Sequence, residues 1–289
     1  MNSSQDLYRK ALRGALDIRS RARVSRSAPI CVYDLAETVG VEVKFIGGNS
    51  FGGMYSKTTE TVLVPALRPP GRQAFTCGHE IGHWYFGHGN RVEEVDALES
   101  DDSDDPEERL ANAFAGYLLA PPWAVKEAYE RRKWDIGSCT TTQAYVVAVQ
   151  LGLGYQTLVH HLRWSLKAIS GDHASRLLRM TPKDIRRSCL GFDHPHHLII
   201  ADQFWTAVPI DLQVGDIALL PFDAHVEGQH VSRLGAKDGT TLVQGVRPGI
   251  SQATRKGSDW AAFIRVARRG FTGRSIYRHM EDNDVDADT

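Results

Sequence analysis

The segment Cys77-Gly78-His79-Glu80-Ile81-Gly82-His83 decides the fold, because it places two histidines four residues apart beside a glutamate. On a helix, positions four residues apart differ by about 40° around the axis, so the imidazoles of His79 and His83 project from one face. Two neutral imidazoles are an incomplete ligand set for Zn²⁺, which takes a third protein ligand and leaves a position for water. Glu80 lies on the adjacent face, where its carboxylate can accept a proton from that water.

The residues around this segment distinguish a metal site from a surface helix that carries two histidines by chance. Phe75 precedes the segment and the aromatic run 84–86 follows it, as expected for a helix half buried under an active site. Gly82 leaves room for another backbone or a substrate beside the second histidine. We therefore predict that the segment binds zinc.

The third ligand must come from elsewhere in the chain. A metzincin would carry a glycine three residues and a histidine six residues after the second histidine. Phe86 and Gly89 occupy those positions, which excludes that class. A strong helix follows Pro106 and ends at Pro121, and it is the best source of the missing ligand.

One stripe of that helix consists of Glu108, Ala111, Asn112 and Ala115. The small residues let the helix pack closely on the first one, so that Glu108 reaches the metal and Asn112 hydrogen-bonds a ligand. A carboxylate favoured by the helix dipole is the other explanation for Glu108, although Glu107 fits that explanation better.

The linked pattern of both helices resembles the ImmA/IrrE family of bacterial and phage metallopeptidases. It consists of Phe75, His79-Glu80-x-x-His83 and Glu108-x-x-x-Asn112-x-Phe114-Ala115-x-x-Leu118-Leu119-x-Pro121. The resemblance covers roughly residues 5–165, including a short helix and strand at 34–43 and a strand at 61–65 that lies across the cleft. It departs from the family at Cys77-Gly78, where Leu-Ala is more usual, and at Ala120, where Met is common.

The resemblance implies an α+β, zincin-like metallopeptidase that cleaves a cognate helix-turn-helix repressor, typically at one site. Such cleavage relieves repression of mobile-element, phage-defence or DNA-damage genes. An alternative is a binding module that keeps the peptidase fold and sequesters a transcription regulator without proteolysis. Intact His79, Glu80, His83 and Glu108 favour the enzyme.

The expected mechanism follows from the ligands. Zinc held by His79, His83 and Glu108 lowers the pKa of its bound water toward 7, and Glu80 accepts the proton and returns it to the leaving amine. The chemistry of Tyr117, Tyr55 and His88 suits a donor to the oxyanion, but each has a structural explanation too, His88 as a solvated helix-end residue. An edge strand near 62–64 could bind an extended substrate by strand addition.

Composition limits the other function classes. The chain of 289 residues has a formal net charge of -1, which indicates neither nucleic acid nor membrane as a partner. No apolar run is long enough to span a membrane and the first residues lack a signal-peptide core, so we expect a cytoplasmic protein. The four cysteines are scattered, which favours reduced thiols over a metal site.

We predict four segments along the chain. Residues 1–170 form the zinc peptidase domain with a helical extension, 171–190 a helical linker, 191–280 a smaller, mostly β, regulatory domain, and 281–289 a disordered acidic tail. The acidic run at 93–108 is either a solvated loop, which we favour, or a gate that selects substrate by charge.

Local signals support these segments. Helices at 140–150 and 155–165 are spaced like a helix-turn-helix, but packing on the peptidase core is the better explanation than DNA reading. Thr181 and Pro182 begin another helix as N-cap and first residue. Short strands separated by turn residues are expected at 197–201, 216–220, 240–244 and 261–267.

A run of basic residues near the C-terminus suggests a ligand for the second domain. Aromatic residues are interleaved with Arg265, Arg268, Arg269 and Arg274, a composition that single-stranded DNA-binding surfaces use for phosphate contact and stacking. A solvated basic terminus would look the same. If the second domain senses an inducer, we expect single-stranded DNA or a small molecule.

Overall fold

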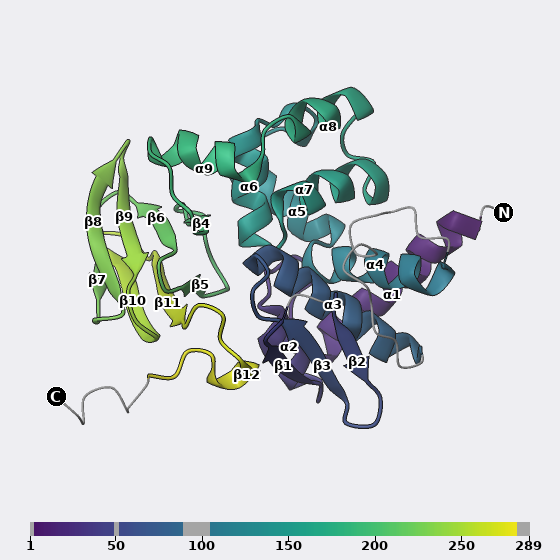
Figure 1. Cartoon of the computed structure of the whole chain (residues 1–289). Coiled ribbons are helices and arrows are strands. Elements are labelled where there is room, and N and C mark those ends of the chain that lie inside the picture. The colour runs from purple at the N-terminus through teal and green to yellow at the C-terminus, as the bar shows by residue number, and fades with distance from the viewer. Residues whose placement is uncertain (1–2, 49–51, 89–104, 282–289) are drawn as a thin grey trace.

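The computed structural model describes residues 3–48, 52–88 and 105–281, which form a mixed α+β structure as predicted (Figure 1). Within those ranges, no helix combines the length and the apolar character needed to cross a membrane. Most of the acidic run 93–108 and nearly all of the acidic tail lie outside the described residues.

The first part of the chain builds a four-stranded sheet with the order β12-β1-β3-β2. Strands β1 and β3 are parallel, and β12 and β2 pair antiparallel at the two edges. Because β3 lies between two neighbours, the predicted edge strand at 62–64 is wrong. In the described part of the chain the edge beside β3 is β2. The bounds are β1 Glu42–Ile46, β2 Met54–Ser56, β3 Thr61–Pro65 and β12 Gly273–Arg274.

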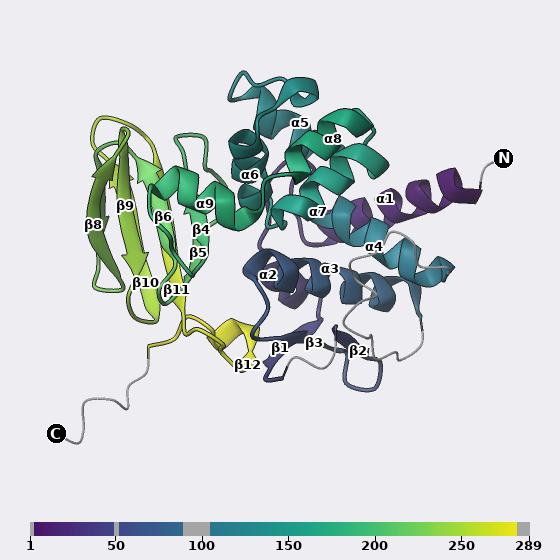
Figure 2. The ribbon, with the colours of Figure 1, turned by 45° about the horizontal axis from the view of Figure 1, so that its top comes forward.

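Helices α2 (Val32–Thr38) and α3 (Pro70–Phe86) lie over one face of this sheet (Figure 2). Helix α4 (Pro106–Leu119) packs closely on α3 through small residues. A Cβ on Gly78 would lie 3.4 Å from the Cβ of Ala115, and a Cβ on Gly82 would lie 3.3 Å from the Cα of Ala111. The small-residue stripe therefore does bring the two helices together.

The N-terminal helix α1 (Ser3–Arg21) packs along α4. Its Arg19 side chain is 1% exposed and donates from Nη1 to the carbonyl of Leu118 at 2.6 Å. Arg19 also donates to the carbonyls of Ser25 and Ala28. This arginine thus fixes the exit of α1 against α4.

Five helices extend the first domain. The hydroxyl of Tyr145 donates to the carbonyl of Leu198 at 2.7 Å, and that of Tyr155 to the carbonyl of Leu177 at 2.8 Å. The pair spaced like a helix-turn-helix, α6 and α7, is therefore built into the protein core, in line with the packing explanation. The bounds are α5 Pro122–Glu130, α6 Thr141–Gln150, α7 Tyr155–His160, which continues as a π-helical turn to Ser165, α8 Gly171–Leu178 and α9 Pro182–Leu190.

The β-rich module consists of two four-stranded sheets, ordered β5-β11-β10-β7 and β4-β6-β9-β8, which share one apolar core (Figure 1). The sequence predicted β4, β6, β9 and β11 but missed the others. The bounds are β4 Leu198–Ile200, β5 Ile210–Gln213, β6 Ile217–Pro221, β7 Ala224–Glu227, β8 Val231–Lys237, β9 Thr240–Gly245, β10 Gly249–Arg255 and β11 Ala261–Ala267.

After β11 the chain returns to the first sheet. In β12, Arg274 pairs with Lys44 and Gly273 pairs with Phe45 of β1. The predicted β domain at 191–280 therefore needs a correction at its C-terminal end, because β12 at 273–274 belongs to the first sheet. The sequence could not show this, since a two-residue strand has no periodicity.

Candidate metal centre

The two histidines and the glutamate of the sequence motif lie side by side on α3 and are buried. His79 is 0%, Glu80 2% and His83 3% exposed. The Nε2 atoms of His79 and His83 lie 2.8 Å apart, so both imidazoles direct the same nitrogen to one point. The four-residue spacing on the helix produces this arrangement.

Glu108 supplies the third donor from the first turn of α4. Asp105 caps this helix by accepting from the backbone N–H of Glu107 at 2.8 Å, and Pro106 takes its first position. The Oε2 atom of Glu108 lies 3.3 Å from Nε2 of His79 and 3.6 Å from Nε2 of His83.

The chemistry and spacing of these donors fit zinc. The three ligand atoms lie within 4.8 Å of one another. Among the described residues, theirs is the one cluster of three side chains that could hold a metal ion. In a tetrahedral zinc site with bonds of about 2.1 Å, donor atoms lie roughly 3.4 Å apart. The two distances to Glu108 agree with this value, and the imidazoles would separate by about half an ångström.

Neighbouring side chains orient both imidazoles. The Oδ1 atom of Asn112 lies 2.8 Å from Nδ1 of His79 and accepts its N–H. Nδ1 of His88 lies 2.9 Å from Nδ1 of His83. When the ligands carry their protons on Nδ1, their Nε2 lone pairs point to the metal position, which is the arrangement that zinc requires.

His88 therefore differs from its expected role. The explanation as a solvated residue at the helix end is wrong, because the side chain is buried at 8% exposure. A role as donor to the oxyanion stays a prediction. Gly87 ends α3 in a left-handed conformation (φ 72°), and this turn brings the chain back so that His88 meets the preceding turn. His88 positions His83.

Gly53 is a residue of the site that the sequence did not reveal. A Cβ at this position would lie 2.6 Å from Oε1 of Glu80 and 2.5 Å from Cγ2 of Thr76. The backbone before β2 therefore passes directly over the carboxylate of Glu80. The pair Gly52-Gly53 ahead of a strand was the available signal, because paired glycines indicate a close backbone approach.

The contacts of the two tyrosines suggested as donors lie mainly with other elements. The hydroxyl of Tyr117 donates to the carbonyl of Ser165 at 3.2 Å, and its ring packs on that of His161. Burial raises the pKa of Tyr117 to about 12. Tyr55 is buried in β2 opposite Val62, and within the described residues its hydroxyl has no hydrogen bond to the three ligands. Tyr117 therefore has a packing role in the core, and its role as a donor to the oxyanion stays a prediction.

The arginines suggested for nucleic acid mostly face carboxylates. Arg265 is held by both oxygens of Asp211, at 2.6 and 2.7 Å, and by Asp34 at 2.7 Å. Arg269 pairs with Asp216, and Arg274 with Glu42, each at 2.7 Å. Arg268 lines a cavity between the two halves of the molecule. The ion pairs give Arg265, Arg269 and Arg274 a structural role, and their contact with nucleic acid stays a prediction.

The cysteines contribute nothing to the metal group within the described residues. All four are free thiols, as expected from their spacing. Burial raises the pKa of the Cys77 thiol well above its usual range, so Cys77 is an inert core residue behind the first histidine.

A buried HExxH helix joined by a glutamate from a second helix defines the metal centre of a metallopeptidase-type domain. Residues 36–163 match the sequence model of the IrrE N-terminal-like domain of the M78 peptidases. This part of the chain is therefore similar to the ImmA/IrrE family, as its resemblance indicated.

One curated relative and one solved structure give the extent of the similarity. The chain is 30% identical over 99 residues to the radiation response metalloprotease IrrE of Deinococcus radiodurans, which covers 34% of this chain and 30% of that protein. It thus spans less than a third of the relative's length. A Mycobacterium tuberculosis transcriptional regulator matches 55% of this chain and 46% of its own at 20% identity, with a TM-score of 0.37, a value too low to support any inference.

Proposed function

We propose that the chain is a zinc-dependent, zincin-like endopeptidase of the cytoplasm that cleaves a helix-turn-helix repressor at one site. The observation that carries the proposal is the convergence of His79, His83 and Glu108 beside the buried carboxylate of Glu80. The family of residues 36–163 supports the peptidase activity. The name of the relative, a radiation response metalloprotease, supports a role in a stress response.

His79, His83 and Glu108 would hold the zinc ion, which supplies Lewis acidity toward the scissile carbonyl and toward water when it is bound. Glu80 lies next to this position and takes a proton from the attacking water. It then delivers the proton to the nitrogen of the leaving amine. Asn112 and His88 keep the two imidazoles in the orientation that binds metal.

Strand β2 is the best place for an extended substrate. Its pairing with β3 leaves its other edge without a partner strand among the described residues. Gly53, directly before β2, lies against Glu80, so a peptide added to this edge would pass beside the catalytic carboxylate. Backbone pairing recognises the conformation of a substrate, and the repressor's own surface must then supply the specificity.

The decisive experiment uses a candidate repressor, chosen as a helix-turn-helix protein whose gene lies next to this one. The chain with zinc should cut this protein at one bond, identified by mass spectrometry, and Glu80→Gln should abolish cleavage while zinc content is unchanged. Glu107→Gln is a matched control, because Glu107 lies on the first turn of α4 next to the ligand Glu108, and it should keep the activity.

Sequestration of the repressor without proteolysis is the alternative. It requires no proton transfer, so Glu80→Gln would then preserve full derepression of a reporter gene in cells. Loss of derepression in Glu80→Gln, with the partner still co-purifying, supports proteolysis. Full derepression by Glu80→Gln would show that the chain acts as a binding module and not as an enzyme.

A further inference from the structure

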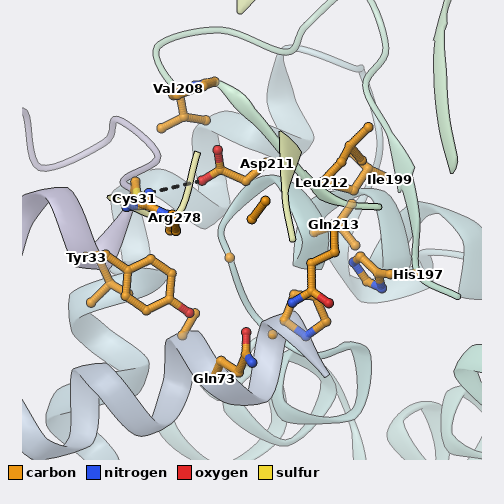
Figure 3. Close-up of a pocket in the computed structure, with 18 of the residues that line it drawn as sticks. Cys31, Tyr33, Gln73, His197, Ile199, Val208, Asp211, Leu212, Gln213 and Arg278 are labelled. Atoms are coloured by element: carbon orange, nitrogen blue, oxygen red, sulfur yellow. Dashed lines mark hydrogen bonds and ion pairs between the residues drawn. The ribbon is translucent and has the colours of Figure 1, made fainter. Parts of the chain in front are cut away.

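Two hollows in the described part of the molecule differ in the charge of their walls. The cavity between the two halves of the molecule is mainly apolar, and Arg278 lies 3.7 Å from Asp211 in its wall, so these opposite charges are paired (Figure 3). A groove of about 470 Å³ between α1 and the C-terminal end of α3 carries an excess of positive charge. Its walls include the side chains of Asp6, Arg9, Lys10, Arg13, Tyr85 and Phe86.

The groove follows from the amphipathic pattern of α1. Residues 6, 9, 10 and 13 lie three or four positions apart and therefore form one exposed stripe of this helix. Ala11 and Ala15, at 0% exposure, belong to the opposite, buried stripe. Gly14 allows a close approach to α3, because a Cβ there would lie 2.7 Å from Cε1 of Tyr85. The cations of α1 therefore stand directly beside the aromatic end of α3.

The positive charge of the groove is largely free of ion pairs within the described residues. Asp6 lies 3.9 Å from Arg9, and their side chains are 59% and 60% exposed, so this pair is weak. Lys10 lies 5.0 Å from the centre of the Phe86 ring, and no described carboxylate pairs with Lys10 or Arg13. Three cations and one carboxylate leave a net charge of +2, so the groove attracts an anion.

The two rings offer their edges to an occupant of the groove, because their faces are covered. Tyr85 stacks on Phe114 and Phe86 stacks on His88, with ring centres 5.7 and 5.8 Å apart. A cation also lies over each ring, at 5.6 and 5.0 Å from its centre. Bases of a single-stranded nucleic acid need an open ring face for stacking. Ring edges carry a positive partial charge, so they favour carboxylates beside the three cations.

The groove adjoins the candidate metal centre. Phe86 is three residues after His83 on α3, which corresponds to about 4.5 Å along the helix axis. The ring of His88 connects the two places, since it stacks on Phe86 and its Nδ1 lies 2.9 Å from Nδ1 of His83. An extended polypeptide at the metal position therefore reaches the groove within a few residues, at about 3.3 Å per residue.

We propose that this groove binds an acidic segment of the protein that the chain cleaves, and so contributes to the choice of substrate. The inference rests on the proposed function, because it assigns the anion to a protein substrate. Carboxylates of the segment pair with Arg9, Lys10 and Arg13, and each arginine can bind both oxygens of one carboxylate. These residues lie outside the metal ligands, so they strengthen substrate binding and leave the chemical step unchanged.

A binding assay without cleavage tests the groove apart from catalysis. Fluorescein-labelled octaglutamate is added to the full-length Glu80→Gln chain with zinc at low salt, and its anisotropy is recorded. Octaglutamate should bind at one site per chain, and added salt should weaken binding because exposed charges are screened. Octathymidylate, a single-stranded DNA of the same length, should bind more weakly. Absent octaglutamate binding, or tighter binding of octathymidylate, overturns the proposal.

Variants in the same assay locate the binding. Replacing Arg9, Lys10 and Arg13 together by glutamine should weaken octaglutamate binding at least about tenfold, because three charge-assisted contacts are lost. The matched control removes three exposed lysine charges outside the groove and should bind octaglutamate like the parent chain. Its substitutions are Lys126→Gln, Lys183→Gln and Lys256→Gln. Equal weakening by both triple variants would report the loss of overall charge and contradict a site in the groove.

Cleavage kinetics separate this inference from the proposed function. With Glu80 intact and the candidate repressor as substrate, the groove variant should raise KM at least about tenfold and leave kcat within about twofold. An unchanged KM overturns the proposal. Cleavage of the repressor by a chain that does not bind octaglutamate contradicts the groove alone. Octaglutamate binding in the groove of a chain that cuts no repressor contradicts the peptidase.

Discussion

Each candidate histidine ligand uses its two ring nitrogens for different purposes. Nε2 of His79 faces the metal position, while its Nδ1 is held by Asn112 at 2.8 Å. His83 has the same division of roles, with His88 as the outer partner. Because a fixed Nδ1 proton leaves Nε2 as the acceptor, these outer residues determine how strongly the site binds metal.

Replacing Asn112 tests this division of roles. Asn112→Leu should weaken zinc binding by about 10–100-fold, because the imidazole of His79 loses the acceptor that orients it. Asn112→Asp retains an oxygen at the same place and should restore most of the affinity. Competition with a chromogenic chelator measures both values. Equal zinc affinity in the leucine variant and the wild type would show that Asn112 does not orient the ligand.

Replacing Gly53 gives a second prediction for a single residue. Gly53→Ala should lower peptidase activity by at least about tenfold, because its Cβ would lie 2.6 Å from Oε1 of Glu80 and must displace the carboxylate or the strand. Gly47→Ala is the control, since a Cβ there meets nothing within 4 Å. Both variants are compared by cleavage rate and by thermal unfolding. Full activity of Gly53→Ala at unchanged stability would contradict the close approach.

At the scale of elements, the sequence predicted what local signals specify. The HExxH spacing, the small face of α4 and the Thr181 cap of α9 each depend on neighbours within a few residues. The order of β2 and β3 in the sheet depends on contacts between distant segments, and so the edge was assigned to the wrong strand. Strand β8 was missed because it has three exposed residues in a row at 232–234 and lacks the alternation that marks a half-buried strand.

The junction of α4 with the π-helical turn after α7 should make stability depend on pH. His161 is 5% exposed and its Nε2 donates to the carbonyl of Ala120 at 2.9 Å. Burial lowers the pKa of His161 to about 4, below its usual 6.5. The unfolded chain therefore takes up this proton first, and the contribution of His161 to stability falls as pH decreases from 6.5 to 4.

Chemical denaturation at pH 7 and pH 5 measures this effect. Between these two values the wild type should lose about 2 kcal/mol more free energy of unfolding than His161→Leu, which has no proton to take up. His160→Leu, at the exposed neighbouring position, should keep the wild-type dependence on pH. Parallel curves for the wild type and His161→Leu would show that His161 does not titrate as its burial requires.

At the scale of the whole molecule, ion pairs join the β-rich module to the peptidase sheet. Arg265 of β11 reaches Asp34 in α2, Arg278 reaches the same carboxylate, and Arg274 pairs with Glu42 of β1. Composition suggested that such arginines contact nucleic acid, since a sequence lists charges but does not show their partners. The structure uses them to hold the cavity walls and the returning strand β12 in place.

Replacing Arg265 distinguishes a structural role of this arginine from a role in binding nucleic acid. Arg265→Gln removes both bonds to Asp211, whose side chain is 35% exposed and still lies near Arg278. The free energy of unfolding should therefore fall by about 1–2 kcal/mol, between the values for an exposed and a fully buried pair. The control Arg233→Gln, on the exposed face of β8, should change the free energy of unfolding by less than about 0.5 kcal/mol.

Fluorescence anisotropy with a labelled single-stranded oligonucleotide at low salt measures nucleic-acid binding by the same variants. A variant of unchanged stability that loses oligonucleotide binding would restore the nucleic-acid role, whereas lost stability with unchanged anisotropy assigns Arg265 to the junction between the modules.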